Sequence, residues 1–245
     1  MSNTILKQGE RLDDLECSGL KIIQDKRGYT FTMDAVLLAN FVKAKPSDRI
    51  VDIGTGSGVI AILLSGKTQA KEIVGIELQE RLYNMASRSV LLNNIGNRVK
   101  LINCDMRIAH LETGTGVFDV AVMNPPYMPY EGNVEDAKEI DICRREVSIT
   151  LKESLESAAR LLKFGGILYI ILKGERLADL ICAMRSSGIE PKKITPIQPA
   201  PHKNIDTIIV EGKKDGKSGM IFNKQLTILD EDGNYKEEAR RFYNK

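Results

Sequence analysis

The chain has 245 residues, of which 42 % are hydrophobic and 28 % charged, and its formal net charge is +2. These values are ordinary for a soluble globular protein, and so small a net charge does not by itself indicate nucleic-acid binding. No run of about 18 apolar residues occurs and the N-terminus lacks a secretory signal, so we expect a cytoplasmic protein without a membrane-spanning helix. The four cysteines and two histidines are scattered, which predicts neither a disulfide framework nor a metal site.

The middle of the chain alternates short β-rich runs with helical patterns, which is typical of a parallel sheet covered on both faces. Seven strands are predicted, at residues 49–53, 72–77, 99–103, 118–123, 167–172, 193–198 and 205–211. The expected helices are at residues 34–42, 60–64, 79–93, 147–162 and 176–186, and Gly165 with Gly166 is expected to end the fourth. The short link between the last two strands suits an antiparallel hairpin. The predicted fold is therefore α/β, with a doubly wound, mostly parallel seven-stranded sheet and an antiparallel terminal hairpin.

A single domain is expected over residues 1–245, with no internal repeat. Its core is predicted at residues 46–212. Residues 1–45 precede the first core strand and are expected to cover the binding site. Residues 213–245 form a tail, in which the apolar run at 225–229 predicts a further strand or a terminal hairpin.

A glycine-rich turn joins the first core strand to the helix that follows it. The turn reads Asp52-Ile53-Gly54-Thr55-Gly56-Ser57-Gly58. Glycines let the backbone turn sharply and approach a ligand closely, and the N-terminus of the following helix offers unpaired amides. The pattern predicts a cofactor site that includes Asp52, Gly54, Thr55, Gly56 and Gly58. The turn alone does not identify the cofactor, because dinucleotide sites use a related arrangement.

Glu77 ends the next predicted strand, 25 positions after Asp52. A carboxylate there can accept hydrogen bonds from both hydroxyls of a ribose, as it would for a nicotinamide cofactor. The glycine spacing, however, is Gly54-x-Gly56-x-Gly58 and not Gly-x-Gly-x-x-Gly. With Asp52 before it, this arrangement resembles the class I S-adenosylmethionine-dependent methyltransferases.

The resemblance to that family implies a Rossmann-like fold and S-adenosyl-L-methionine as the cofactor. It also implies that Asp52 lies near the methionine moiety, that Glu77 binds the ribose and that Asp105 meets the adenine amine. Leu78 and Met106, which directly follow two of these acids, are expected in the same site.

The segment Asn124-Pro125-Pro126-Tyr127 directly follows the fourth core strand. Two consecutive prolines fix φ twice and remove two backbone donors, which leaves rigid and free carbonyls. The side-chain oxygen of Asn124 and the carbonyl of Pro125 can accept the two hydrogens of a planar amine, and this frees the nitrogen lone pair for methylation. Tyr127 can stack on a flat acceptor. We therefore predict N-methylation of a planar exocyclic amine by these four residues, and Asn124 is expected to lie beside the cofactor as well.

Methyltransferases that share this motif act on adenine, guanine or cytosine amines, or on a glutamine amide. About fifty residues precede Asp52, fewer than the helical domain of the glutamine enzymes requires, and the chain has no room for the target-recognition domain usual in DNA adenine enzymes. A ribosomal RNA amine and a protein glutamine remain alternatives, as does an inactive module that only binds the cofactor.

Residues 28–39, together with Arg144-Arg145-Glu146, resemble the bacterial family that methylates N6 of adenine 37 in a valine tRNA. This resemblance implies a tRNA partner. It also implies that Thr32 and Asp34 close over the cofactor from the N-terminal side.

A tRNA partner gives a role to two groups of basic residues. The candidates for RNA contact are Lys26, Arg27, Lys192, Lys193 and Lys203. Solvated surface side chains explain such groups equally well. The acidic segment 131–141 fits less well, because its carboxylates would repel phosphate. No membrane or metal partner is expected, and the expected state is a monomer or a weak homodimer.

Overall fold

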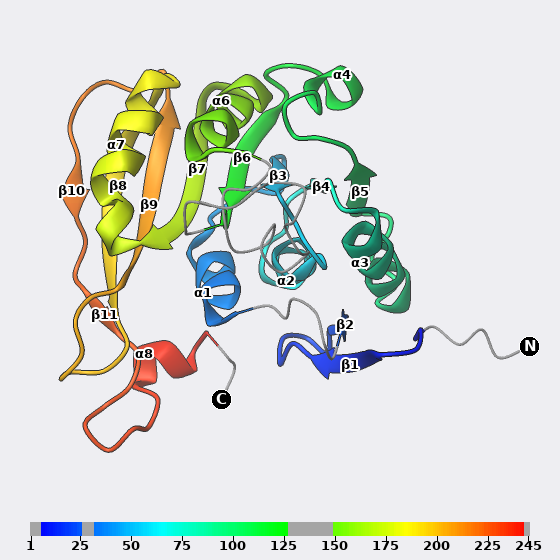
Figure 1. Ribbon diagram of the computed structural model, residues 1–245, viewed down its shortest axis with the longest axis horizontal. Coiled ribbons are helices and arrows are strands. Elements are labelled where there is room, and N and C mark those ends of the chain that lie inside the picture. Colours follow the sequence, from blue (N-terminus) through cyan, green and yellow to red (C-terminus); the bar gives the residue numbers. More distant parts are fainter. Residues whose placement is uncertain (1–5, 26–31, 127–148, 243–245) are drawn as a thin grey trace, which may run out of the picture.

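The computed structural model describes residues 6–25, 32–126 and 149–242. Its centre is a nine-stranded sheet in the order β10-β8-β9-β7-β6-β3-β4-β5, with β11 also paired to β8 (Figure 1). The strands are β3 (Arg49–Ile53), β4 (Glu72–Glu77), β5 (Val99–Asn103), β6 (Phe118–Met123), β7 (Leu162–Lys173), β8 (Ile189–Gln198), β9 (Thr207–Lys214), β10 (Ile221–Phe222) and β11 (Leu226–Thr227). β9 runs antiparallel to β7 and β8, and the other neighbours pair in parallel.

Helices cover both faces of this sheet (Figure 1). One face carries α1 (Met33–Phe41), α2 (Val59–Lys67) and α3 (Glu80–Leu92). The other carries α4 (His110–Thr113), α6 (Leu151–Leu161) and α7 (Leu177–Ser186), the last preceded by the 3₁₀ turn η2 (Gly174–Arg176). Each strand serves both layers because successive side chains point to opposite faces. Ile50 thus belongs to the apolar cluster that holds α1 and α2, whereas Val51 belongs to the cluster that holds α6 and α7.

The predicted α/β fold with a mostly parallel sheet is confirmed. β3, β4, β5 and β6 have the predicted bounds, and β8 with β9 forms the predicted antiparallel hairpin. The sheet has more strands than the seven expected, because β10 and β11 of the tail add to its edge beside β8.

The boundary between α6 and β7 differs from the prediction. The sequence predicts that Gly165 and Gly166 end the helix, but α6 ends at Leu161 and both glycines lie inside β7. Leu162 already has extended dihedrals, with φ −71° and ψ 141°. Gly165 has a φ of +75°, and the pairing of β6 with β7 changes register just after Phe118. The glycines therefore allow an irregular start to the strand, in a backbone conformation that residues with a Cβ rarely adopt.

The N-terminal segment contains a hairpin that the sequence does not indicate. Its strands are β1 (Glu10–Asp14) and β2 (Lys21–Asp25), which pair antiparallel and pack near α3. β1 reads Glu-Arg-Leu-Asp-Asp, so it lacks the apolar alternation of a predicted strand. Its connection to β2 is a turn in which Glu16, Ser18 and Gly19 have positive φ.

The C-terminal tail follows the edge of the sheet and returns to α1 (Figure 1). The predicted apolar run at 225–229 contains β11, which is parallel to β8. At its end Leu229 pairs antiparallel with Tyr235 across the turn that contains Gly233, so the run contributes to a short terminal hairpin as well as to a strand. A short helix, α8 (Glu237–Arg240), then brings Phe242 within 5.9 Å of the Phe41 ring. In the described ranges no helix combines the length and apolarity that crossing a bilayer would require.

Candidate active site

Four parallel strands end in one row at the carboxyl edge of the sheet. Ile53 of β3 pairs with Ile76 of β4 and with Met123 of β6, and Glu77 of β4 pairs with Asn103 of β5. The segments that follow these strands therefore lie next to one another. Strand order reverses between β3 and β6, and in sheets of this kind ligands bind at that reversal, outside the carboxyl ends of the strands.

The glycine-rich turn after β3 is held by backbone hydrogen bonds to β4. The amides of Gly54 and Thr55 both donate to the carbonyl of Ile76, at 3.0 and 2.9 Å. Gly56 has a φ of +59°, and no atom of the described residues lies within 4 Å of the place a Cβ would take, so among these residues this side of the turn is open to a ligand. At Gly58 a Cβ would lie 3.0 Å from the Cβ of Ala86 on α3. Gly58 is therefore required by helix packing as well as by its positive φ.

Asp52 is fully buried beneath this turn. Its Oδ2 accepts a hydrogen bond of 2.5 Å from the Thr55 hydroxyl, and its Oδ1 has no hydrogen-bond partner among the described residues. Burial is the main cause that raises the pKa of Asp52 to about 7, the charge of Glu77 contributes in the same direction, and the Thr55 hydroxyl opposes it. A buried acceptor of this kind suits a donor on a ligand, such as the cationic amino group of a methionine moiety. Thr55 orients Asp52 in this arrangement.

Glu77 at the end of β4 connects the glycine turn to the next segment. Its Oε2 accepts a hydrogen bond from the Gly56 amide and its Oε1 accepts one from the Gln79 amide, both at 2.8 Å. Each carboxylate oxygen can accept a second hydrogen bond, which leaves capacity for the hydroxyls of a ribose. The side chain is 6 % exposed, so its position is well defined by its surroundings.

A small, mostly apolar cleft lies beyond Glu77, between the ends of β4 and β5. It is lined by Ile76, Leu78, Cys104, Asp105, Met106, Arg107 and Ile149. Three of these, Leu78, Asp105 and Met106, are predicted cofactor residues. The cleft has mostly apolar walls with one acid, Asp105, and one base, Arg107. The chemistry of these residues, together with the buried carboxyl of Asp52 and with Glu77, is compatible with S-adenosylmethionine.

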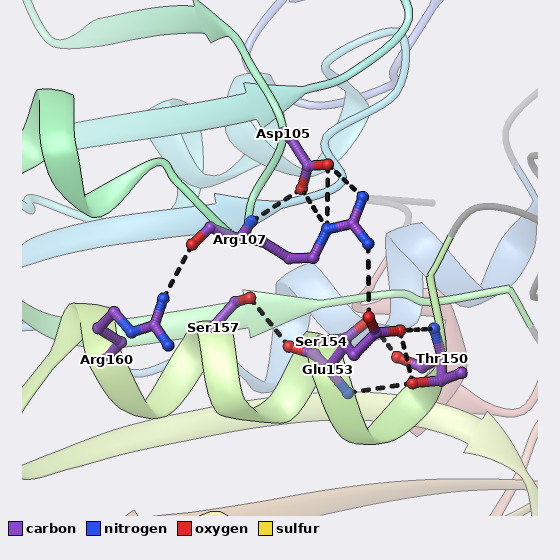
Figure 2. Close-up of polar contacts among 7 residues, drawn as sticks. All are labelled: Asp105, Arg107, Thr150, Glu153, Ser154, Ser157 and Arg160. Atoms are coloured by element: carbon purple, nitrogen blue, oxygen red, sulfur yellow. Dashed lines mark hydrogen bonds and ion pairs between the residues drawn. The ribbon is translucent and has the colours of Figure 1, made fainter.

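Arg107 is a residue of this cleft that the sequence does not single out. Figure 2 shows its guanidinium against the carboxylate of Asp105. The guanidinium nitrogens donate hydrogen bonds of 2.5 to 3.0 Å to the two carboxylate oxygens. The hydrogen bonds from Arg107 are the main cause that lowers the pKa of Asp105. The same guanidinium lies 3.4 Å from Glu153 of α6, and Arg160 of α6 donates to the Arg107 carbonyl at 2.9 Å. Arg107 therefore connects the cleft to the helix that follows the catalytic segment.

The start of α6 is fixed by a reciprocal capping arrangement. The Thr150 hydroxyl accepts from the Glu153 amide, while the Glu153 carboxylate accepts from the Thr150 amide at 2.9 Å (Figure 2). Such a capping box satisfies two backbone donors at a helix N-terminus. This capping box therefore fixes the residue at which α6 begins.

Asn124 and Pro125 directly follow Met123, at the end of β6. Met123 of β6 pairs with Ile53 of β3, so the next residues, Asn124 and Gly54 of the glycine-rich turn, lie beside each other. Asn124 is half-buried and Pro125 is buried. Pro126 completes the described part of the motif, whereas Tyr127 lies outside the described residues.

α1 and the tail form a second cavity on the other side of β6, over the ends of β7, β8 and β9. It is lined by Met33, Asp34, Leu37, Lys173, Ile197, Pro199, Asp206, Thr207, Ile228, Leu229 and Tyr235. Its volume is about 210 Å³, which is below the range of about 300–1,000 Å³ that is usual for pockets of drug-sized ligands. Asp34, a predicted cofactor residue, lines this cavity, and Thr32 is an exposed N-cap residue of α1 without a side-chain capping bond.

Of the predicted RNA-binding residues that the structure describes, Lys203 lies apart from Lys192 and Lys193. Lys203 is exposed in the turn between β8 and β9, at the same edge of the sheet as Asn124. Lys192 and Lys193 lie well before the end of β8. The Lys192 ammonium donates to two backbone carbonyls, and Lys193 forms an ion pair of 2.8 Å with Glu211. Lys26 and Arg27, like the acidic segment 131–141, lie outside the described residues.

Comparisons with known proteins agree on one class. A curated tRNA1(Val) (adenine(37)-N6)-methyltransferase of Flavobacterium johnsoniae is 25 % identical over 208 residues, covering 84 % of this chain and 88 % of its own. One of the same name from Haemophilus influenzae is 28 % identical over 222 residues, covering 88 % and 90 %.

Solved structures share the fold. A protein of Agrobacterium tumefaciens described as a predicted O-methyltransferase superposes with a TM-score of 0.70 at 22 % identity, covering 86 % of this chain and 96 % of its own. TYW2 of M. jannaschii, solved in complex with AdoMet, has a TM-score of 0.59 at 16 % identity, covering 85 % and 87 %. The family model of the methyltransferase small domain matches residues 32–179, more than half of the chain. The expectation of an S-adenosylmethionine-dependent methyltransferase is thereby confirmed, and the chain belongs to the methyltransferase small domain family.

Proposed function

We propose that this enzyme methylates N6 of an adenine in tRNA, namely adenine 37 in the anticodon loop of a valine tRNA. The observation that carries the proposal is the position of Asn124 and Pro125, which leave β6 directly beside the cofactor turn. The names of relatives that align over most of their length support this acceptor. An enzyme of this kind acts where tRNA is found, in the cytoplasm.

The cofactor half of the site would be formed by the residues after β3, β4 and β5. Asp52 would meet the amino group of the methionine moiety, Glu77 the ribose, and Asp105 with its apolar neighbours the adenine. When bound, S-adenosylmethionine supplies an electrophilic methyl group on a positively charged sulfur. Glu77 also holds the Gly56 amide, so cofactor binding and the shape of the turn depend on the same carboxylate.

The acceptor amine would be placed by Asn124 and Pro125. The side-chain oxygen of Asn124 and the Pro125 carbonyl accept its two hydrogens, and neither Pro125 nor Pro126 has an amide that could compete. Holding both hydrogens directs the nitrogen lone pair toward the methyl group. No strong base is needed, because the proton leaves after transfer. Placement alone can contribute about 7–11 kcal/mol to lowering a barrier.

The anticodon loop would lie over the cavity between α1, the strand ends and the tail. A single-stranded adenine enters a pocket at less cost than a paired one, which favours a loop nucleotide as acceptor. Lys203 at this edge would contact the RNA backbone. Residues 1–45 and 213–245 would thus complete the acceptor side of one domain, in a monomer or a weak homodimer.

The test uses labelled S-adenosylmethionine and a transcript of valine tRNA with adenine at position 37. A transcript with guanine at that position is the matched control. We expect label in the first RNA only, at N6-methyladenosine after digestion. Total RNA, ribosomes and release factor are incubated in parallel. Label in ribosomal RNA or in protein, with none in tRNA, would refute the proposed acceptor and identify another.

A further inference from the structure

The hairpin of β1 and β2 is anchored to α3 by contacts that lie outside the cofactor site. Arg88 of α3 forms a two-pronged ion pair with Glu10, at 2.6 and 2.7 Å. The Asn93 side chain donates to the Lys21 carbonyl at 2.6 Å and accepts from the Lys21 amide at 2.9 Å. Paired contacts of this kind set orientation as well as distance. The hairpin therefore has a defined position relative to the core.

Gln24 of this hairpin reaches the cofactor turn. Its side chain is fully buried, and its Nε2 donates a hydrogen bond of 2.7 Å to the Oγ of Ser57. Ser57 is 1 % exposed and lies between Gly56 and Gly58. Both side chains are buried, so losing this bond would deprive the buried Ser57 hydroxyl of its Gln24 partner, whereas Gln24 Nε2 also donates to the Ile23 carbonyl at 3.3 Å.

The Gly56–Gly58 segment is thus held from two directions. Glu77 of β4 accepts from the Gly56 amide, and Gln24 of β2 donates to the hydroxyl of the next residue, Ser57. Both glycines have positive φ, and glycine has little intrinsic preference for one backbone conformation. The shape of this segment therefore depends on hydrogen bonds, namely the one within the turn from the Gly58 amide to the Thr55 carbonyl, at 2.9 Å, and those made by Glu77 and Gln24.

We propose that Gln24 is a positioning residue for the cofactor. Through Ser57 it holds the glycine turn in the conformation that receives S-adenosylmethionine. The inference rests on the cofactor half of the proposed function and not on the identity of the acceptor. Gln24 lies before residues 32–179, the part matched by the family model, so that match assigns it no role.

The test is a calorimetric titration with S-adenosylhomocysteine, which needs no acceptor. The variants are Gln24→Met, which keeps the length of the side chain, Ser57→Ala and the double variant. We expect Gln24→Met to raise Kd by about 10-fold, the loss typical of one buried hydrogen bond. Because both residues act through one contact, the double variant should bind within about 2-fold of Gln24→Met. In turnover assays the effect should fall on KM for the cofactor more than on kcat.

The matched control is Glu10→Gln, which weakens the anchoring of the same hairpin away from the turn. It should lower Tm while leaving Kd within about 2-fold. A Gln24→Met protein with a lowered Tm and unchanged Kd would overturn the proposal, as would additive effects in the double variant. If Gln24→Met does not fold, the test rests on Ser57→Ala alone. An unchanged Kd in Ser57→Ala would also overturn the proposal. If the Kd values change as expected but tRNA is not methylated, only the proposal that tRNA is the methyl acceptor is refuted.

Discussion

The carboxyl edge of the sheet has two halves that are built in different ways. The proposed cofactor half consists of short stretches at the ends of β3, β4 and β5, and its acids Asp52, Glu77 and Asp105 each lie within two residues of a strand end. The proposed acceptor half combines the end of β6 with α1, the β8–β9 turn and the tail. Met33 and Tyr235, which line one cavity, are about 200 positions apart in the sequence.

This difference reflects what each half must recognise. A cofactor shared by many enzymes can be bound by local motifs on a common sheet, because strand order alone brings those motifs together. An acceptor specific to one enzyme is bound by the segments that differ between enzymes, which are the chain ends and long connections. Substitutions should therefore separate into those that change cofactor affinity and those that change transfer or RNA binding.

The largest effect is expected at Asn124, where the two halves meet. Asn124→Ala removes one of the two acceptors for the amine hydrogens, and kcat should fall by about 10²- to 10³-fold. Kd for S-adenosylhomocysteine should stay within about 2-fold. Asn124→Asp retains a side-chain oxygen and should lose less activity. A large loss of cofactor affinity in Asn124→Ala would place this residue in the cofactor half.

The next largest effect is expected at Asp52, within the cofactor half. Asp52→Asn removes the charge that we propose to face the methionine amino group, and Kd should rise by about 10- to 100-fold. Because the pKa of Asp52 in the free protein is about 7, the wild-type carboxyl becomes protonated below that pH. Affinity for the cationic ligand should therefore fall as pH decreases below 7, by at most about 10-fold per unit, and be constant above it. Asp52→Asn should lack this pH dependence.

Measuring the free energy of unfolding of Asp52→Asn shows whether its loss of affinity has another cause, namely partial unfolding of the variant. A carboxyl whose pKa is raised in the folded state binds more protons there than in the unfolded chain, between its ordinary pKa near 4 and about 7. The contribution of this carboxyl to the free energy of unfolding therefore decreases as pH rises through that interval, and it stays reduced at higher pH. The ligand-free Asp52→Asn protein should be at least as stable as wild type at pH 8. A less stable variant would show that Asn cannot be accommodated there.

A smaller effect is expected at Arg107, at the outer end of the cofactor half. Arg107→Met removes the hydrogen bonds that orient Asp105 and should raise the pKa of that carboxyl toward its ordinary value. Since Arg107 is about half exposed, Kd should change by only about 2- to 5-fold, as for other exposed ion pairs. Arg160→Met removes only the bond to the Arg107 carbonyl and should leave Kd unchanged. Equal effects in both variants would mean that the loop as a whole, and not Asp105, is affected.

The same comparison explains what the sequence could predict. β3, β4 and β6 were predictable to the residue because parallel strands buried on both faces read as nearly continuous apolar runs. The bounds of β5, an edge strand that is only partly buried, were also predicted. β1 was not, because this charged strand is stabilised by a distant partner, Arg88, which bonds Glu10. In the site, Asp52 and Asn124 follow from local motifs. Gln24, Arg107 and the tail residues of the acceptor cavity depend on which segments meet in the fold, and a linear pattern does not contain that information.

The smallest effect distinguishes the β8–β9 turn, which contains Lys203, from Lys192 and Lys193 inside β8. Lys203→Glu places an acid at the edge of the sheet where Asn124 also lies, so tRNA binding should weaken. The slope of the logarithm of the binding constant against the logarithm of the salt concentration should become less steep by about one. Lys192→Glu with Lys193→Glu changes residues already engaged by backbone carbonyls and by Glu211, so its effect on tRNA binding should be smaller. Filter binding over a range of salt concentrations measures both. If the double variant weakens binding more than Lys203→Glu, the RNA extends along β8, and the acceptor half is larger than the edge formed by α1, the β8–β9 turn and the tail.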